Sequence, residues 1–409
     1  MTGRTVGVLV SHGQRWLGAL EPFPVESPWW PDVEPVNSHL TTRLGVETSV
    51  LRLIDASGTA PRDGTVTYHV EVADDVTAAV PWRPIPPATA AQVMAVQPRR
   101  RPWAKPGGPA LDVRWADAAL AAAGRRRVGP ATQVKTWNLS CVHKLPTDEG
   151  NVWLKVTGPE QTREEIPIAE VAAVDRDLVA QVVAADPERG RIVCAELPGR
   201  DLPDQHLDVV VAAVERWVHV QAELATTGTE ALVRSGVRAW PMADLADPVE
   251  RLLREEKTSA LSATERAQLG ALLRELSGRT TAIRAAGVPD TLVHGDFTPI
   301  NWRGDQSRVA IMDWSDAYVG HPAADLVALL SRMPAEWHPA VIEAWCRTWG
   351  EAVPGSDPSV TVDLVRPLVH MRMALVYAAF LDAIEESEWC YHEDDPVAQL
   401  RLALETWHE

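Results

Sequence analysis

The stretch that most constrains this chain of 409 residues is 291–326, TLVHGDFTPINWRGDQSRVAIMDWSDAYVGHPAADL. Two short apolar runs, 291–293 and 309–312, predict two buried strands. Each run is followed directly by polar side chains, and a proline-containing turn lies between the runs. The polar positions that matter most are His294, Asp296, Asn301 and Asp313.

These polar positions fit the needs of phosphoryl transfer. That reaction uses a carboxylate to orient the attacking hydroxyl and accept its proton, and oxygen ligands to hold Mg²⁺ against phosphates. Asp296 suits the first role, and Asn301 with Asp313 suits the second. The alternative is a hairpin whose Asp and Asn side chains only form turns. A third acidic position, Asp325, favours the phosphoryl-transfer interpretation.

The spacing His-x-Asp-x-x-x-x-Asn also matches a kinase catalytic loop. With Gly295 in place of the usual Arg, and with the later Asp-Trp and Gly-His-Pro-Ala-Ala-Asp-Leu motifs, it resembles the aminoglycoside phosphotransferase and choline kinase family. The resemblance covers roughly residues 113–390. It implies an α+β, protein-kinase-like bilobal fold, with a β-rich N-lobe and a helical C-lobe. It further implies Asp296 as catalytic base, Asn301 and Asp313 as Mg²⁺ ligands, and structural support from His294, Asp316 and Asp325.

The predicted N-lobe, residues 113–200, contains a lysine within an apolar strand, Lys155 in 152–156. A lysine there is costly without a partner, and kinases supply phosphate oxygens and a helix glutamate. The candidate glutamates are Glu164, Glu165 and Glu170, of which we choose Glu165 as the nucleotide-site residue. The alternative is a solvated strand, because the alternation places Lys155 on the face opposite the apolar residues.

The other nucleotide contacts follow from the resemblance, because the chain has no Gly-x-Gly-x-x-Gly motif. The loop 136–141 takes that position, with Asn138 and Ser140 expected to touch phosphate. A strand over 191–196 leads to the expected hinge, where backbone groups of Glu196 and Leu197 would read the base. The expected cofactors are ATP or GTP, a choice the sequence leaves open, with Mg²⁺.

Residues 1–77 predict a small α/β accessory domain, with strands at 5–10, 48–54 and 65–72 and a helix at 33–44. Asp32 is a candidate N-cap and Gly45 a C-terminal stop for that helix. The arrangement distantly resembles a Nudix fold, but the helix lacks the metal-binding glutamate pair of that family. We therefore expect a degenerate, non-catalytic domain.

Residues 78–112 carry eight prolines between Pro81 and Pro109, and three consecutive arginines at 99–101. Each proline removes a backbone donor, so a partly polyproline-like linker is expected. The arginines could bind an anion, although such a run is more often a solvated junction.

The predicted C-lobe, residues 201–409, contains the catalytic loop and ends in an acidic segment. Asp382, Glu385, Glu386 and Trp389 recur at helical spacing, which predicts one shared helical face. Carboxylates beside an aromatic ring would suit an amino-bearing hydroxylated acceptor, so Asp382, Glu386 and Trp389 are the acceptor candidates. A solvated acidic face is the alternative.

Composition narrows the partners. The formal net charge of −17 argues against nucleic acid, which binds clustered Lys and Arg. Four widely spaced cysteines fit a reducing, cytoplasmic location, and we expect neither a signal peptide nor a membrane-spanning run. The function expected is a small-molecule kinase; the alternative is a catalytically weak nucleotide-binding regulatory module. A protein kinase fits less well, because Ala-Pro-Glu and activation-loop elements are absent after Asp313. The acceptor, the role of the first domain and the oligomeric state stay open.

Overall fold

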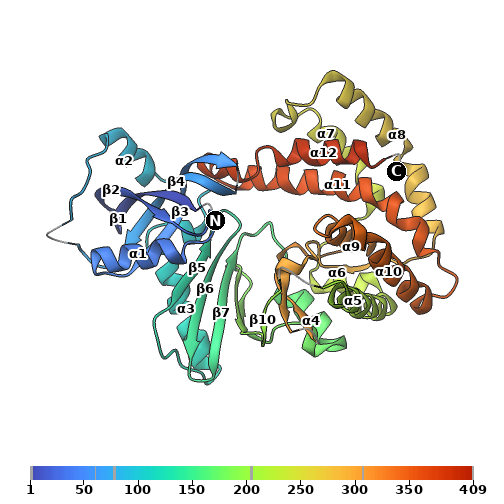
Figure 1. The fold of residues 1–409 in the computed structure, drawn as a ribbon, viewed down its shortest axis with the longest axis horizontal. Coiled ribbons are helices and arrows are strands. Elements are labelled where there is room, and N and C mark those ends of the chain that lie inside the picture. The colour runs from blue at the N-terminus through green and yellow to red at the C-terminus, as the bar shows by residue number, and fades with distance from the viewer. Residues whose placement is uncertain (1–2, 60, 77–79, 203–205, 306–307, 408–409) are drawn as a thin grey trace. The chain divides into compact units, whose positions relative to one another are not determined.

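The computed structural model describes residues 3–407, apart from residue 60 and residues 77–79, 203–205 and 306–307 (Figure 1). The chain divides into two compact units, each assembled from separate stretches of sequence. The first unit consists of Met1–Glu160, Val182–Glu196 and Ala379–Glu393, and the second of Gln161–Gln181, Leu197–Ala378 and Asp394–Glu409. The division into four consecutive domains stays a prediction.

The first unit begins with a four-stranded sheet in the order β2-β1-β4-β3, in which β1 and β4 run parallel and the other pairs antiparallel. Its strands are β1 (Arg4–His12), β2 (Arg15–Val25), β3 (Thr48–Thr59) and β4 (Arg62–Val72). Alternating residues of β1, including Val6 and Val8, are buried with Val36 and Leu40 of α1 (Glu34–Leu44). The period-2 and helical patterns in the sequence therefore meet in one core.

The expected strands and helix of this region are confirmed, but β2 was missed. Its sequence contains Gly18, Pro22 and Pro24, and an edge strand tolerates proline because one side makes no ladder hydrogen bonds. Gly45 ends α1 in the left-handed conformation, at φ 71°, as expected. Asp32 is not the N-cap: Val33 holds that position, and the Asp32 carboxylate accepts a hydrogen bond from the Ser27 hydroxyl at 2.8 Å. The Nudix resemblance stays a prediction.

The expectation of a partly polyproline-like linker over 78–112 is wrong where this segment forms helical elements. It contains α2 (Pro87–Met94), a 3-10 turn (Pro102–Ala104) and the start of α3 (Gly108–Ala122). A proline lies in the first turn of each of these elements, where its missing N–H costs nothing. Val93 of α2 packs with Leu9 and Ala19, and Trp103 is buried in the core of the next sheet.

The second sheet of the first unit is antiparallel and has the order β5-β6-β7-β9-β8. Its strands are β5 (Thr132–Thr136), β6 (Ser140–Thr147), β7 (Gly150–Thr157), β8 (Val182–Asp186) and β9 (Arg191–Ala195). Val152, Leu154 and Val156 of β7 point into its core, so the predicted alternation is confirmed. The late segment Ala379–Glu393 belongs to the same unit, because Tyr391 is buried against Trp30 with ring centroids 5.6 Å apart.

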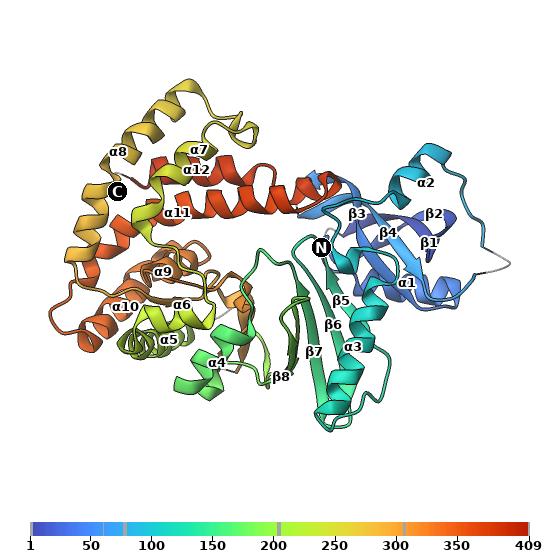
Figure 2. The same ribbon diagram turned by 180° about the vertical axis from the view of Figure 1, so that it is seen from behind.

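The second unit is mostly helical. Its helices are α4 (Glu165–Val174), α5 (Leu207–Thr227), α6 (Thr229–Ser235), α7 (Ala246–Leu252), α8 (Ala263–Ala285), α9 (Ala323–Leu330), α10 (His338–Ala352), most of α11 (Pro358–Ala383) and α12 (Asp395–Glu405). α11 and α12 run side by side in both views (Figures 1 and 2). Short strands complete the unit: β11 (Thr291–Val293) pairs with β14 (Tyr318–Gly320), and β12 (Trp302–Gly304) lies between β10 (Arg200–Asp201) and β13 (Val309–Ile311).

One described helix, α11, is long and apolar enough to cross a bilayer by length and composition alone. Of its most apolar stretch, 56% is buried inside the fold. Burial of that kind is also found in the core helices of globular proteins.

Candidate active site

Asp296 and Asn301 form the centre of the candidate site in the second unit. Asp296 is the third residue after β11, and a 3-10 turn (Pro299–Asn301) brings Asn301 back toward it. The Asn301 amide nitrogen donates to the Asp296 carboxylate at 2.8 Å and to the Asp296 carbonyl oxygen at 3.0 Å. With its nitrogen so engaged, Asn301 keeps its amide oxygen as the atom able to ligate a cation.

Asp313 is the second residue after β13, which pairs with β12. The Met312 N–H donates to the Asn301 carbonyl at 2.8 Å, so the turn carrying Asn301 is bonded directly to the residue before Asp313. Asp313 has a left-handed backbone, at φ 63°, and an exposed side chain whose Oδ1 accepts from the Ser315 hydroxyl at 2.7 Å. A non-glycine residue in this conformation is uncommon, and such strain clusters at functional sites.

His294 and Asp325 hold the backbone of the loop. The Asp325 carboxylate is 2% exposed and accepts from the backbone N–H groups of His294 and Gly295, both at 2.9 Å, and from the Trp217 indole at 2.8 Å. Burial raises the pKa of Asp325, and these donors oppose the rise. His294 donates from Nε2 to the Met312 carbonyl, which leaves Nδ1 to accept the Asp296 N–H. The proton on His294 Nε2 is therefore used in a structural hydrogen bond.

Gly295 is required at its position. Its backbone is left-handed, at φ 88°, and a Cβ there would lie 2.3 Å from the carbonyl oxygen of Asp316. Any side chain would therefore collide with backbone rather than with a movable side chain. The His-Gly-Asp form of this chain follows from that close approach.

The buried glutamate before α4 is Glu164, not Glu165. Glu164 is 7% exposed, and its carboxylate accepts from the N–H of Trp314, the residue directly after Asp313, at 2.9 Å. Glu165 instead forms an ion pair with Arg163 at 2.8 Å. A helix start can bring either of two adjacent acids inward, and the fold buries Glu164. The nucleotide-site role of Glu165 stays a prediction.

Lys155 lies in the first unit, in the middle of β7. It is half-buried and is paired across the sheet with Val142 of β6 and Ile192 of β9. The residues paired with Lys155 on both neighbouring strands are therefore apolar. Its role toward phosphate stays a prediction.

The loop between β5 and β6 carries Asn138 and Ser140. The Trp137 N–H donates to the Ser140 carbonyl and the Trp137 indole to the Ser140 hydroxyl, each at 3.0 Å, so the loop is closed on itself. Asn138 is fully buried, and neither end of its amide has a hydrogen-bond partner among the described residues. A buried side-chain amide without a hydrogen-bond partner is rare in native structures, so Asn138 calls for a structural or functional explanation.

Arg101 anchors this loop, and the sequence interpretation of the arginine run missed it. It is 7% exposed, donates from Nε to the Asn138 carbonyl at 3.1 Å, and forms an ion pair with Glu160. The expectation that the arginine run is a solvated junction is therefore wrong for Arg101, and also for Arg100, which is equally buried.

The hinge residues have protein partners on two of their backbone groups. The Glu196 N–H donates to the Asn151 carbonyl at 3.0 Å, and the Leu197 carbonyl accepts from Arg303 at 2.8 Å. The Glu196 carboxylate also accepts from Asn151 and forms an ion pair with Lys144 at 3.1 Å. A nucleotide base that contacted Glu196 and Leu197 would meet backbone groups other than the Glu196 N–H and the Leu197 carbonyl.

The expected acidic helical face near the C-terminus is wrong. α11 ends at Ala383, and Glu385 has an extended backbone before a new 3-10 helix (Glu386–Tyr391) begins. Glu385 is buried against Arg100, Glu386 is exposed, and the Trp389 indole donates to the Leu381 carbonyl at 3.0 Å. Asp382, also exposed, lies on the last turn of α11. The acceptor roles of Asp382, Glu386 and Trp389 stay predictions.

A different group of acids lies near the catalytic loop within the second unit. Tyr377 of α11 has a raised pKa, first through burial and then through the negative charges of Asp395, Asp316 and Asp296. Asp395 opens α12, so the loop, α11 and α12 all contribute to this group. No sequence pattern indicated Tyr377, because it lies 81 residues from Asp296 along the chain.

The residues fit a magnesium site that is completed by a phosphorylated ligand. No group of three or more His, Cys, Asp or Glu side chains in the described part of the chain is placed to hold a metal ion by itself. Mg²⁺ is commonly held by one or two carboxylates together with substrate phosphates. Asp313 and the Asn301 amide oxygen provide that kind of incomplete set.

The comparisons with known proteins agree with this geometry. Residues 147–359 match the model of the phosphotransferase enzyme family, which is more than half of the chain. The chain belongs to this family and is a small-molecule phosphotransferase that acts on a hydroxyl group. A comparison with curated proteins finds no match.

Solved structures support the fold. A choline/ethanolamine kinase family protein from Mesorhizobium loti is 18% identical, with a TM-score of 0.50, and the match covers 72% of this chain and 95% of that one. A provisionally assigned aminoglycoside phosphotransferase from Ralstonia eutropha is 14% identical, with a TM-score of 0.51, covering 73% and 98%. The predicted kinase-like α+β fold is thereby confirmed.

Proposed function

We propose that this protein transfers the γ-phosphoryl group of ATP or GTP, with Mg²⁺, to a hydroxyl of a small amino-bearing acceptor. The observation that carries the proposal is the pair of hydrogen bonds from Asn301 to Asp296, next to the strained Asp313. This is the relation between base and metal ligand that phosphoryl transfer needs.

In the proposed reaction, Asp296 orients the acceptor hydroxyl and takes its proton as the oxygen attacks the γ-phosphorus. The bond from that phosphorus to the β,γ-bridging oxygen breaks, and the nucleoside diphosphate leaves. Asn301 holds the Asp296 carboxylate in place through the 2.8 Å hydrogen bond. His294 cannot compete as base through Nε2, because that nitrogen donates to the Met312 carbonyl.

Asn301 and Asp313 would hold Mg²⁺, which supplies positive charge against the phosphate oxygens when bound. Asp313→Ala should abolish the metal-dependent tightening of nucleotide binding, measured by calorimetry with and without Mg²⁺. An unchanged metal dependence would assign Asp313 to a turn role alone.

Lys155, Asn138 and Ser140 are the proposed donor-side contacts. Asn138 supports this through its buried, unpartnered amide, and Lys155 through its position between two apolar neighbours. Glu165, Glu196 and Leu197 are the remaining proposed residues of the nucleotide site. Glu164, one of the three candidates from the sequence, is the buried carboxylate and accepts from the N–H of Trp314, the residue after Asp313.

The amino-bearing acceptor is supported by the acids around the catalytic loop. Asp316 and Asp395 influence the same buried tyrosine as Asp296, so a cationic group held by them would place a neighbouring hydroxyl near the base. Asp382, Glu386 and Trp389 remain the acceptor candidates from the sequence. The proposal includes a cytoplasmic location and no nucleic-acid or membrane partner.

The test is an assay of nucleoside diphosphate release with paired acceptors, such as glucosamine against glucose and ethanolamine against ethylene glycol. We expect turnover only with Mg²⁺ and faster turnover with the amine of each pair. Asp395→Asn should remove the preference for the amine, whereas Asp363→Asn, an exposed acid on α11, is the matched control. Nucleotide binding without turnover on any acceptor would favour the alternative, a regulatory module on a kinase scaffold.

A further inference from the structure

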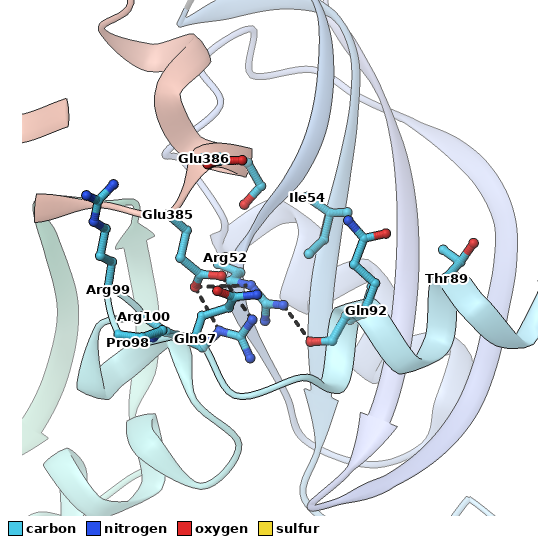
Figure 3. A pocket seen from close by; sticks show the side chains of 12 residues that line it. Arg52, Ile54, Thr89, Gln92, Gln97, Pro98, Arg99, Arg100, Glu385 and Glu386 are labelled. Atoms are coloured by element: carbon cyan, nitrogen blue, oxygen red, sulfur yellow. Dashed lines mark hydrogen bonds and ion pairs between the residues drawn. The ribbon is translucent and has the colours of Figure 1, made fainter. Parts of the chain in front are cut away.

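A cavity of about 610 Å³ lies within the first unit, and Glu386 is the one residue of its lining that is also assigned above to phosphoryl transfer (Figure 3). It is bordered by β3, α2, the segment 97–100 and the start of the 3-10 helix after α11. Its volume is in the range of pockets that bind small molecules. Arg52, Arg100 and Glu385 converge in its middle, and Thr89 and Gln92 line it along α2.

The charges in this cavity do not balance. Three guanidiniums line it, from Arg52, Arg99 and Arg100, against the two carboxylates of Glu385 and Glu386. Arg52 is 2% exposed and Arg100 is 7% exposed, and both contact the same carboxylate. Burial lowers the pKa of Arg52 to about 10, so it is still charged at neutral pH. Two buried positive charges therefore share one buried negative charge, and an uncompensated buried charge is costly.

The other nearby carboxyl group does not restore the balance. Glu388 is fully enclosed, and burial followed by the charge of Glu385 raises its pKa to about 8, against the opposing effect of Arg52 and Arg101. It is therefore mostly protonated at neutral pH. His69 also stays neutral, because burial and the two arginines lower its pKa to about 3, and it accepts a hydrogen bond from Arg52.

The arginines keep donors for a further partner. Arg100 donates from Nε and Nη2 to Glu385 at 2.7 and 2.9 Å and from Nη1 to the Ala95 carbonyl. Arg52 donates to the Val93 carbonyl at 2.7 Å, and its Nε has no hydrogen-bond partner among the described residues. A guanidinium has five N–H donors, so both side chains have capacity beyond these bonds.

The remaining lining suits a polyol. Gln92 and Gln97 are exposed amides, able both to donate and to accept, and Ile54 with Val93 offers an apolar wall for C–H groups. Amides beside a small apolar wall bind hydroxyls and the face of a sugar ring, and a guanidinium recognises phosphate oxygens. We propose that this cavity binds a phosphorylated sugar, with the phosphate on Arg99 and Arg100 and the hydroxyls on Gln92 and Gln97.

Binding would also stabilise the chain segment that forms one wall. Ser387 donates to the Leu53 carbonyl of β3 at 3.2 Å, and the Glu385 carboxylate forms ion pairs with the two buried arginines. A ligand that neutralises the surplus positive charge strengthens the cluster as a whole. Hydrogen exchange in residues 385–391 should therefore slow when the ligand is bound.

The experiment is calorimetry on the full chain with glucose 6-phosphate, inorganic phosphate, gluconate and glucose. We expect saturable binding that is tightest for glucose 6-phosphate, weaker for phosphate and for gluconate, and absent for glucose. Arg99→Ala and Gln92→Ala, both at exposed positions, should each weaken glucose 6-phosphate binding, Arg99→Ala by roughly tenfold or more. Arg83→Ala, an exposed arginine of the same unit outside the cavity, is the matched control.

Two further measurements keep the result independent of the proposed nucleotide site. Glucose 6-phosphate binding should survive in Lys155→Ala, and bound ligand should slow exchange in 385–391. The proposal is overturned if no probe binds saturably, if Arg99→Ala binds as wild type, or if Lys155→Ala abolishes binding while Arg99→Ala retains it. Gluconate binding as tightly as glucose 6-phosphate would replace the phosphate by a carboxylate and overturn the phosphate assignment.

Discussion

Asp325 in the second unit and Glu385 in the first are both buried carboxylates, 2% and 9% exposed, but their partners differ in kind. Asp325 accepts from neutral donors, including two consecutive backbone N–H groups of the catalytic loop. Glu385 is held by two guanidiniums that belong to distant stretches of the chain. Neutral backbone donors fix the shape of a loop, whereas guanidiniums attach one chain segment to another and leave surplus charge. The first arrangement fixes the backbone of the loop that carries Asp296, and the second joins distant segments of the first unit.

The largest effect is expected at the catalytic loop. Asp296→Asn should lower kcat by roughly 10²–10⁴-fold, because the hydroxyl proton loses its acceptor. Nucleotide affinity and the melting temperature should stay close to wild type, since the replacement keeps the size of the side chain. Steady-state kinetics and calorimetry measure both quantities, and a turnover near wild type would remove Asp296 from the role of base.

The next effect is on stability, and it follows from removing the Glu385 carboxylate from its two buried arginines. Glu385→Ala should lower the free energy of unfolding by about 3–5 kcal/mol, because it leaves two buried guanidiniums without their carboxylate. Glu386→Ala, the exposed neighbour, is the matched control and should change stability by less than about 0.5 kcal/mol. Urea unfolding measures both, and equal effects would show that the buried pair is not special.

The next prediction concerns the buried carboxyl group of Glu388 and the dependence of the free energy of unfolding on pH. The pKa of Glu388 rises from 4.5 to about 8 in the folded state, so its contribution to stability is fully present below pH 4.5 and is lost as pH rises through about 8. Glu388→Gln should remove this dependence, which amounts to at most a few kcal/mol at about 1.4 kcal/mol per unit. Urea midpoints across pH 4.5–8.5 test it. Parallel curves for the two proteins would contradict the raised pKa.

The smallest effect concerns Arg101, which positions the loop carrying Asn138. Arg101→Ala should raise the nucleotide KM by roughly five- to tenfold, the scale of one lost charge-assisted hydrogen bond, with a smaller change in kcat. Arg83→Ala again serves as control for the lost charge. A kcat loss at constant KM would mean that Arg101 acts on the chemical step instead.

Much of the fold could be predicted because its signals are local. The strands of the first sheet and helix α1 follow from alternation, helical spacing and the Gly45 stop. The strand β2 was hidden by its prolines, which an edge position tolerates. Part of the segment 78–112 forms helices where a polyproline-like linker was expected, because composition does not distinguish a proline in a first helical turn from a proline in an extended chain.

The residues of the candidate site also divide into those that local spacing predicts and those that only the fold brings together. The Asp296–Asn301 relation could be read from spacing, since the two residues are five positions apart. The physical need for glycine at 295 could not, because the Asp316 carbonyl oxygen that a Cβ would meet lies 21 residues further along the chain. The choice of Glu164 over Glu165 for burial could not, because adjacent residues at a helix start differ only in the neighbours that the fold supplies. Tyr377 with Asp395 gave no signal either, because long-range proximity leaves no local pattern.

The sequence by itself determined the family, because the proposed base, the proposed metal ligands and the supporting carboxylate lie within 30 residues of one segment, Asp296 to Asp325. The tertiary structure alone decided where the acidic C-terminal segment goes. Its helix stops at Ala383, and Glu385 turns onto Arg100 while Tyr391 enters the first core. The physical reason is that burying a charge requires a partner, and a partner 285 residues away is specified by the fold and not by any spacing in the chain.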